Sequence, residues 1–204
     1  MNGWLKMISD LGPALGFVSG PLPGGGTNTL TTYLGVFLRR AEELAGPRDP
    51  SWTILGIEFF GEERVGAVPH IWYPGDCRHV AIRLTRDAAF EPARALFQLA
   101  HETCHLISPS GGKPAPNLEE GFATWLGHEL ALQHANYQCP IDPNYKAAHA
   151  AIVALLAHSP AAIRAIRLIE PRLWLVTPEI VEEAVPGFDY RLAEFLCASW
   201  ATDA

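Results

Sequence analysis

The sequence is poor in charge, and it lacks the basic blocks that nucleic-acid binding requires. Charged residues make up only 18% of its 204 positions, and the formal net charge is −7. Phosphate contacts need clustered Lys and Arg, so we expect no nucleic-acid partner. The four cysteines are widely spaced and contain no Cys-x-x-Cys pair. Two disulfides in an oxidising compartment, or buried thiols in a reducing one, both fit that spacing.

The chain also lacks a long hydrophobic run. A membrane-spanning helix needs roughly 18 apolar residues, and no segment of the sequence reaches that length. The short apolar tract near the N-terminus is interrupted by Asp10 and Pro13, which is not typical of a secretory signal. We therefore expect a soluble, cytoplasmic protein with no membrane partner. Apolar residues make up 49% of the sequence, enough for one domain over residues 1–204 with a hydrophobic core.

The pattern of apolar residues predicts an α+β fold in which a small sheet precedes a mostly helical part. Residues 1–26 end in a Gly- and Pro-rich stretch from Gly20 to Gly26 and are expected to be rich in loops. A helix capped by Thr27 or Asn28 is predicted to run to about Ala45. Three β-like runs then predict an antiparallel or mixed sheet: Trp52–Phe60, Ala67–Tyr73 and His79–Leu84.

Helices are predicted for the rest of the chain. One begins near Glu91-Pro92 and ends before Ser108-Pro109, since proline is tolerated at a first helical position. A second runs from Asn117 to about His134. Prolines divide the C-terminal part of the chain into shorter helices. Two more helix starts are marked there, at Thr177-Pro178-Glu179 and at Asp189, the latter ahead of a helix to Trp200.

The first of these helices carries the pattern His101-Glu102-Thr103-Cys104-His105. Helical positions four apart lie on one face, so the two imidazoles project side by side and can bind one zinc ion. Glu102 can then reach a water on that metal. In a chain with eight histidines, chance placement would give this pattern only about 0.02 times. Cys104 falls on the predicted core-facing line and is expected to be a packed thiol.

A catalytic zinc takes three protein ligands, and a third is expected from the next helix. Glu119 and Glu120 are the nearest carboxylates after His105. From spacing alone, the segment Asn117-Leu118-Glu119-Glu120 is equally a capping box, in which a Glu bonds back to the backbone of the cap residue. These residues alone do not distinguish a third metal ligand from a capping box.

The residues around Glu120 add a family resemblance. Glu120-Gly121-Phe122-Ala123-Thr124, following His-Glu-x-x-His, resembles the gluzincin metallopeptidases, in particular the Asn-Glu-Gly-Phe-Ala segment of the aminopeptidase N type. The resemblance covers about residues 80–134 and implies a zincin-like fold, with an active-site helix and a second helix carrying the third ligand. It implies Zn²⁺ as cofactor, peptide or protein substrates, Glu102 as general base, and these metal ligands: His101, His105 and Glu120. Small residues on the second helix, Ala123 and Gly127, would let it approach the histidine helix closely.

A weaker likeness lies downstream. In the same family type a Tyr-x-Lys-Gly segment supplies a tyrosine that stabilises the reaction oxyanion. The segment 189–196 looks similar, which implies this role for Tyr190, although Leu192 stands where the family has Lys. Tyr190 is equally well explained as a core-packed residue of a first helical turn. Rival donors elsewhere in the sequence are Tyr137, Tyr145, His128 and His134.

The sequence also departs from this family. Only 14 residues lie between His105 and Glu120, and no Gly-Ala-Met-Glu-Asn-like segment precedes the motif, so aminopeptidase specificity does not carry over. The strand at His79–Leu84 is expected to offer its edge to an extended substrate, as the resemblance implies. The sequence thus favours a zinc metallopeptidase. The alternatives are a regulatory protease with one protein target and a non-catalytic zinc-binding domain.

Overall fold

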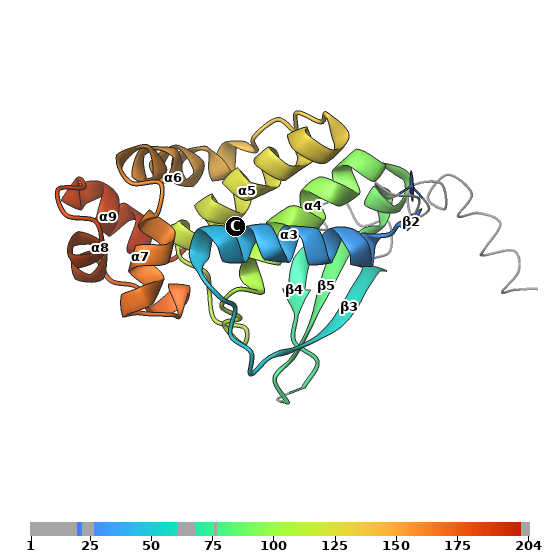
Figure 1. The fold of residues 1–204 in the computed structure, drawn as a ribbon, viewed down its shortest axis with the longest axis horizontal. Coiled ribbons are helices and arrows are strands. Elements are labelled where there is room, and N and C mark those ends of the chain that lie inside the picture. Colours follow the sequence, from blue (N-terminus) through green and yellow to red (C-terminus); the bar gives the residue numbers. More distant parts are fainter. Residues whose placement is uncertain (1–19, 22–26, 61–67, 76, 201–204) are drawn as a thin grey trace, which may run out of the picture.

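The computed structural model describes residues 20–21, 27–60, 68–75 and 77–200, which form an α+β arrangement (Figure 1). In the first part of the chain the elements are β1 (Gly20–Pro21), β2 (Thr27–Asn28), α3 (Leu30–Ala45), β3 (Thr53–Phe60), β4 (His70–Trp72), β5 (His79–Thr85) and η1 (Arg86–Phe90). The remaining elements are α4 (Pro92–His105), α5 (Asn117–Ala135), η2 (Pro143–Tyr145), α6 (Lys146–His158), α7 (Ala162–Ile169), η3 (Leu173–Leu175), α8 (Pro178–Ala184) and α9 (Tyr190–Cys197).

The larger sheet has three strands in the order β3-β5-β4. The outer strand β3 runs parallel to β5, and β4 runs antiparallel to β5. Of the two predicted alternatives, antiparallel and mixed, the sheet is therefore the mixed one. Val80, Ile82 and Leu84 of the central strand are fully buried. A strand covered on both faces reads as a nearly continuous apolar run, which is how the segment from His79 to Thr85 is composed.

The helix α4 lies against β5 on one side and α5 on the other. Its first turn begins with Pro92, which needs no hydrogen-bond acceptor for its nitrogen. Gln98 ties α4 to the end of β5, because its Nε2 donates to Thr85 Oγ1 at 2.7 Å and its Oε1 accepts from the Thr85 backbone N–H at 3.0 Å. In Figure 1 the later helices α7, α8 and α9 gather on the side away from the sheet. The helix α4 is largely buried, with α3, α5 and β5 packed around it.

The start of α5 is fixed by the segment that follows α9. The Asn117 backbone N–H donates to the Ala198 carbonyl at 2.9 Å, and the Asn117 side-chain amide donates to the Phe195 carbonyl at 2.8 Å. Pro116 and Ser199 form an antiparallel bridge, and the Trp200 N–H donates to Ala115. Two segments far apart in sequence thus hold the first turn of α5 in place.

The end of α3 is capped by a buried cation from α7. Arg167 is 7% exposed, and its guanidinium donates to the carbonyl oxygens of five residues: Ala45, Gly46, Pro47, Ile107 and Pro171. A helix C-terminus leaves its last carbonyls without partners inside the helix. Arg167 supplies hydrogen-bond donors to the carbonyls at the end of α3. It also joins that end to the segment that follows α4.

Four expectations about the elements are corrected. Thr27 and Asn28, the expected caps of the first helix, form β2, and the cap of α3 is Thr29, whose side chain accepts from the Thr32 N–H. The Gly20–Gly26 stretch is predicted as a loop, but Gly20 and Pro21 pair with Asn28 and Thr27 in a two-stranded sheet; residues 1–19 and 22–26 lie outside the described part. The second strand is shorter than predicted, at His70–Trp72, and Ala67 is not described. The last helix ends at Cys197, before Trp200, because Ser199 turns to pair with Pro116.

No single helix of the described residues combines the length and apolar composition needed to cross a membrane. The bent pair formed by residues 143–158 and 162–169 meets that test only when the two helices are taken together.

Candidate metal centre

Helix α4 presents the residues of the histidine motif to one point near its C-terminal end. His101 and Glu102 are buried, and His105 is half-buried. The imidazole centroids of His101 and His105 lie 5.3 Å apart, as expected for positions one helical turn apart. The ligand atoms of His101, Glu102 and His105 lie within 4.8 Å of one another. Cys104 is fully buried in the core instead, and burial raises the pKa of its thiol, so the prediction of a packed thiol is confirmed.

Glu120 on α5 brings its carboxylate beside the same two imidazoles. Its carboxylate lies 3.4 Å from Nε2 of His101 and 3.8 Å from Nε2 of His105. Two imidazole nitrogens and a carboxylate are a ligand set that catalytic zinc sites use. The residues present therefore fit a zinc ion in chemistry, and the three groups that would hold it are His101, His105 and Glu120.

Glu119 makes a separate contact with the same histidine. The His105 Nδ1–H donates to Glu119 Oε1 at 2.7 Å, and Glu119 is only 3% exposed. This contact leaves His105 Nε2 as the nitrogen that faces Glu120. Metal-binding histidines typically donate their other ring N–H to a carboxylate in this way. Oε2 of Glu119 is buried and has no hydrogen-bond partner in the described part of the chain.

The capping box considered from the sequence is not formed. Helix α5 begins at Asn117 with Pro116 as its cap residue, and Asn117 uses its side chain to bond Phe195. Glu120 is therefore free of a capping role and turns towards the two histidines. Its first-turn position still places it at the positive end of the α5 dipole, where a carboxylate is favoured.

The buried carboxylates make this site electronegative. Burial alone would lower the pKa of His105, but the neighbouring Glu120 and Glu119 outweigh it and raise that pKa to about 10. Burial raises the pKa of Glu102, against the opposing effect of His105 and His101. For Glu120, burial raises the pKa but the two histidines lower it overall. Three carboxylates held around two imidazoles favour a cation at their centre.

Two glycines let α5 pack closely against its neighbours. A Cβ on Gly127 would lie 3.1 Å from the Phe97 ring of α4, which agrees with the expected close approach of the histidine helix. A Cβ on Gly121 would lie 2.5 Å from the Ala148 carbonyl oxygen of α6. Gly121, next to Glu120, therefore serves the contact with α6, a helix whose position the sequence did not indicate.

Two cavities meet at the motif. One, of about 300 Å³, is lined by the histidines together with Glu119, Glu120, Tyr145 and Trp200, and by β4 residues such as His70 and Ile71. The other, of about 260 Å³, is more apolar and includes Phe97, His128 and Ile141. His101, Glu102 and Tyr145 line both cavities, so the candidate metal position lies at their junction.

The structure does not bring Tyr190 to this junction. Tyr190 is exposed on α9, its hydroxyl donates to Glu179 Oε1 at 3.2 Å, and it lines neither cavity. Tyr145 lies there instead: its ring centroid is 5.7 Å from that of His101, at an angle of 85°. Burial, followed by Glu120 and Glu102, raises the pKa of Tyr145 well above the usual range, so its hydroxyl keeps its proton.

The other rival donors are placed differently. His128 lines the apolar cavity, where its Nε2 is buried without a partner among the described residues. His134 packs against Tyr33 and Phe37. Tyr137 lines neither of the two cavities. Trp200, which packs 4.5 Å from the Tyr145 ring, is a lining residue that no sequence pattern signalled.

The expected role of the strand at His79–Leu84 is wrong. That strand is β5, the centre of the sheet, and both of its edges are paired with β3 and β4. Within the described residues, the edge beside the histidine motif belongs to β4 (His70–Trp72), whose residues line the larger cavity. Apolar composition identified β5 as a strand, but strand order depends on contacts that a linear pattern does not contain.

No match is found among protein-family models, curated proteins or solved structures. The chemistry of the site therefore rests on its own residues.

Proposed function

We propose that the protein is a zinc-dependent metallopeptidase with a zincin-like arrangement of its active-site helices. One observation carries the proposal: the two oxygens of the Glu120 carboxylate lie 3.4 Å from Nε2 of His101 and 3.8 Å from Nε2 of His105. Glu102 adds a carboxylate whose ligand atom lies within 4.8 Å of those of both histidines, at the junction of two cavities. A purely structural metal site has no use for a fourth, adjacent carboxylate such as Glu102.

Each residue has a distinct role in this proposal. His101, His105 and Glu120 hold the zinc ion, and Glu119 orients His105 through its Nδ1–H. The three ligands would hold a zinc ion whose Lewis acidity would lower the pKa of a water and polarise a carbonyl. Glu102 accepts the proton of the attacking water and passes it to the leaving amine. Burial raises the pKa of Glu102, which brings the carboxyl closer to the range in which it can both take and return a proton.

Tyr145 is the proposed partner for charge on the scissile carbonyl. Its hydroxyl makes no hydrogen bond within the described part of the chain, and its ring lies against His101 at the cavity junction. A positioned donor of this kind stabilises the oxyanion that develops in the transition state. The edge of β4, along the larger cavity, is the proposed place where an extended peptide adds as a further strand.

The test of this proposal is the substitution Glu102→Gln. It removes the base but leaves the three ligands, so we expect zinc content near that of the unaltered protein and peptide hydrolysis reduced by at least about 10³-fold. Zinc is measured by elemental analysis after dialysis, and hydrolysis by mass spectrometry of a mixed peptide library. Glu102→Gln protein that keeps its activity would contradict the mechanism.

A second substitution tests the third ligand. Glu120→Ala is expected to lower zinc occupancy strongly, whereas the matched control Glu129→Ala, an exposed residue on the same helix, should leave occupancy unchanged. Equal occupancy in all three proteins would remove Glu120 from the ligand set. If the zinc-loaded, unaltered protein cleaves no peptide in the library, the peptidase proposal is overturned, and a non-catalytic metal-binding domain is the interpretation that remains.

A further inference from the structure

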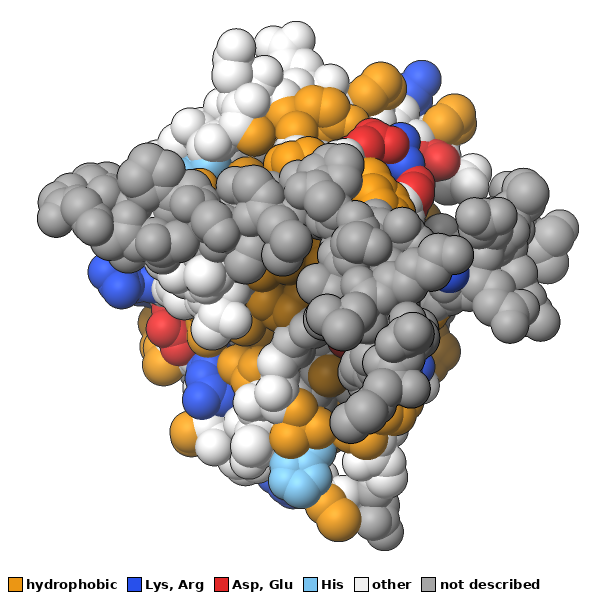
Figure 2. All heavy atoms as spheres, turned by 90° about the vertical axis from the view of Figure 1, so that its right-hand side faces the viewer, with side chains coloured by type: hydrophobic (Ala, Val, Ile, Leu, Met, Phe, Trp, Pro, Cys, Tyr) orange, Lys and Arg blue, Asp and Glu red, His pale blue; other side chains and the backbone are white. Residues whose placement is uncertain are grey.

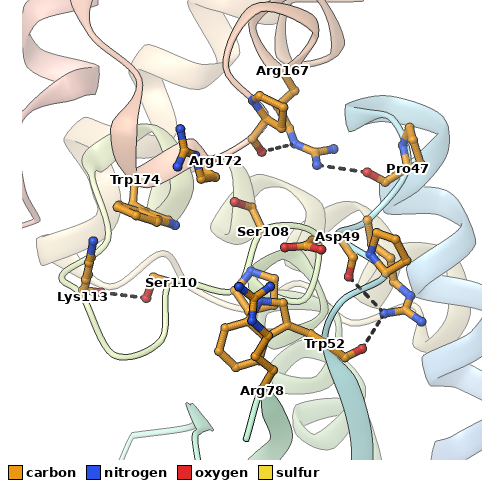
Figure 3. Close-up of a pocket in the computed structure, with 14 residues that line it drawn as sticks. Pro47, Asp49, Trp52, Arg78, Ser108, Ser110, Lys113, Arg167, Arg172 and Trp174 are labelled. Carbon is orange, nitrogen blue, oxygen red and sulfur yellow. Dashed lines mark hydrogen bonds between the residues drawn. The ribbon is translucent and has the colours of Figure 1, made fainter. Parts of the chain in front are cut away.

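A separate basic cavity lies on the other side of the loop that follows the histidine helix. It has a volume of about 520 Å³ and is walled by four segments, Pro47–Trp52, Arg78, Ser108–Lys113 and Arg167–Trp174 (Figure 3). Ser110 and Lys113 line both this cavity and the larger cavity at the metal centre. The two spaces are thus neighbours that share one loop, and none of the proposed metal ligands lines the basic one.

This cavity is lined mainly by positive charges, although the whole chain is negatively charged. The whole sequence carries −7 and has 15 Lys and Arg residues, yet five of these cations line the one cavity: Arg48, Arg78, Lys113, Arg167 and Arg172. Asp49 is the single carboxylate among the described residues that line it. On the face drawn in Figure 2, by contrast, the visible Lys and Arg side chains of the described residues lie apart from one another. So strong a concentration of cations raises the local potential for an anion.

Some of these cations are already used to hold the fold. The hydrogen bonds that Arg167 donates go to backbone carbonyls. Arg172 forms a two-pronged pair with Glu170, at 2.8 and 2.9 Å. Arg48 donates through one nitrogen to the carbonyls of Asp49 and Trp52. Arg48, Arg167 and Arg172 therefore contribute mainly positive charge to the cavity, because many of their N–H groups already donate within the protein.

Other groups on the walls keep donors to spare. Lys113 has no carboxylate partner among the described residues: its Nζ lies 3.7 Å over the Trp174 ring. Within the same part of the chain, the Arg78 guanidinium donates only to Ser51 Oγ, at 2.6 Å. Arg78 also has a φ of 53°, in the left-handed region that residues other than glycine seldom adopt. The Trp174 indole nitrogen also has no acceptor in the described part of the chain, but it is buried and so is not itself open to the cavity; its ring is drawn in Figure 3.

We propose that this cavity binds a small molecule carrying phosphate groups. Arg and Lys donors around one space are the usual means of holding a dianion or polyanion. The volume is far larger than a single phosphate needs and falls within the range of small-metabolite sites. The two tryptophans, Trp52 and Trp174, provide apolar wall beside the charged groups. The proposal rests on this cavity alone and holds whether or not the metal centre is a peptidase.

Pyrophosphate is the probe for the test. Titration calorimetry on the full chain, treated with chelator and dialysed so that metal binding by pyrophosphate does not contribute, should show one site. Succinate at the same ionic strength should bind at least tenfold more weakly, because its carboxylates carry less charge and fewer acceptor oxygens. No binding of pyrophosphate up to 10 mM (on the order of the weakest useful affinity), or equal binding of succinate, would overturn the proposal.

Two substitutions locate the site. Lys113→Met and Arg78→Met, singly and together, remove one or two positive charges from exposed side chains and should weaken pyrophosphate binding, the double variant by at least tenfold. Arg39→Met is the matched control, since Arg39 is exposed on α3 and outside the cavity; it should change the affinity by less than twofold. Circular dichroism verifies the fold of each variant. Unchanged affinity in folded single and double variants would show that the anion binds elsewhere.

Discussion

Tyr145 owes its position to two neighbours rather than to any motif. Its ring packs between His101 and Trp200, and it closes the short helix η2 just before α6. These contacts fix the ring at the cavity junction and leave the hydroxyl pointing to no described acceptor. The hydroxyl of Tyr190, by contrast, donates to Glu179 at the surface. The two tyrosines therefore make a matched pair for testing the proposed donor role.

Tyr145→Phe should lower kcat for peptide hydrolysis by about 100-fold with little change in KM, the signature of a donor that acts only in the transition state. Steady-state kinetics on a peptide found to be cleaved gives both constants. Tyr190→Phe, measured beside it, is expected to match the unaltered protein. A large loss of kcat in Tyr190→Phe alone would return the donor role to α9.

At this scale the sequence indicates what local spacing determines and misses what folding brings together. His101, Glu102 and His105 are adjacent on one helix, so their common face follows from helical geometry. For Glu119 and Glu120, spacing alone does not distinguish a metal ligand from a capping box. The structure excludes the capping box, because Pro116 is the cap residue of α5. Tyr145 lies 40 positions after His105 in sequence, and no periodic pattern joins them.

The contact between α5 and α6 depends on the absence of one side chain. Gly121 follows Glu120 directly, and its Cα faces the backbone of Ala148. Because Ala148 contributes a carbonyl rather than a flexible side chain, an added methyl group can be accommodated only if one helix moves. The position of Glu120 is thus coupled to the packing of α6.

Gly121→Ala should destabilise the fold by about 2 kcal/mol, since overpacking a fixed backbone contact costs more than the gain in helix propensity. Urea unfolding followed by circular dichroism measures the change. Gly35→Ala is the control: Gly35 lies within α3, and a Cβ there meets nothing within 4 Å. It should stabilise by about 0.5–1 kcal/mol. A stabilising Gly121→Ala would show that the two helices are not in close contact.

Elements are easier to predict than their arrangement. The helix to Ala45, the three strands and the starts of α4, α5 and α8 follow from caps, prolines and apolar periodicity, which are properties of neighbouring residues. The order of the strands does not, and the segment His79–Leu84 is therefore predicted at an edge although it is the centre. The early end of α9 likewise reflects the pairing of Ser199 with Pro116, a contact across more than 80 positions.

Over the whole molecule, Arg167 joins parts of the chain that lie far apart in sequence. One side chain on α7 serves carbonyls at the end of α3, after α4 and in the segment before η3. Burial lowers the pKa of Arg167, but a guanidinium stays charged over the ordinary pH range. Its charge is dispersed over several carbonyl dipoles rather than matched by a single carboxylate.

Arg167→Met should cost about 2–5 kcal/mol of unfolding free energy, because it leaves buried carbonyls without donors. The comparison is Arg164→Met on the same helix: Arg164 is exposed and donates to the carbonyls of Glu42 and Glu43, so water can replace it, and the loss should stay below about 1 kcal/mol. Chemical denaturation of both variants measures the two losses. Equal losses would mean that burial of Arg167 contributes nothing of its own.

The pairing of residues 115–117 with residues 198–200 has a consequence for biosynthesis. The ribosome releases the histidine motif and the start of α5 well before Trp200 emerges, yet Trp200 forms part of the cavity wall and packs on Tyr145. A nascent chain therefore displays its histidine pair in an unfinished cleft. The cleft is completed only after residues 198–200 have been synthesised and have docked against residues 115–117.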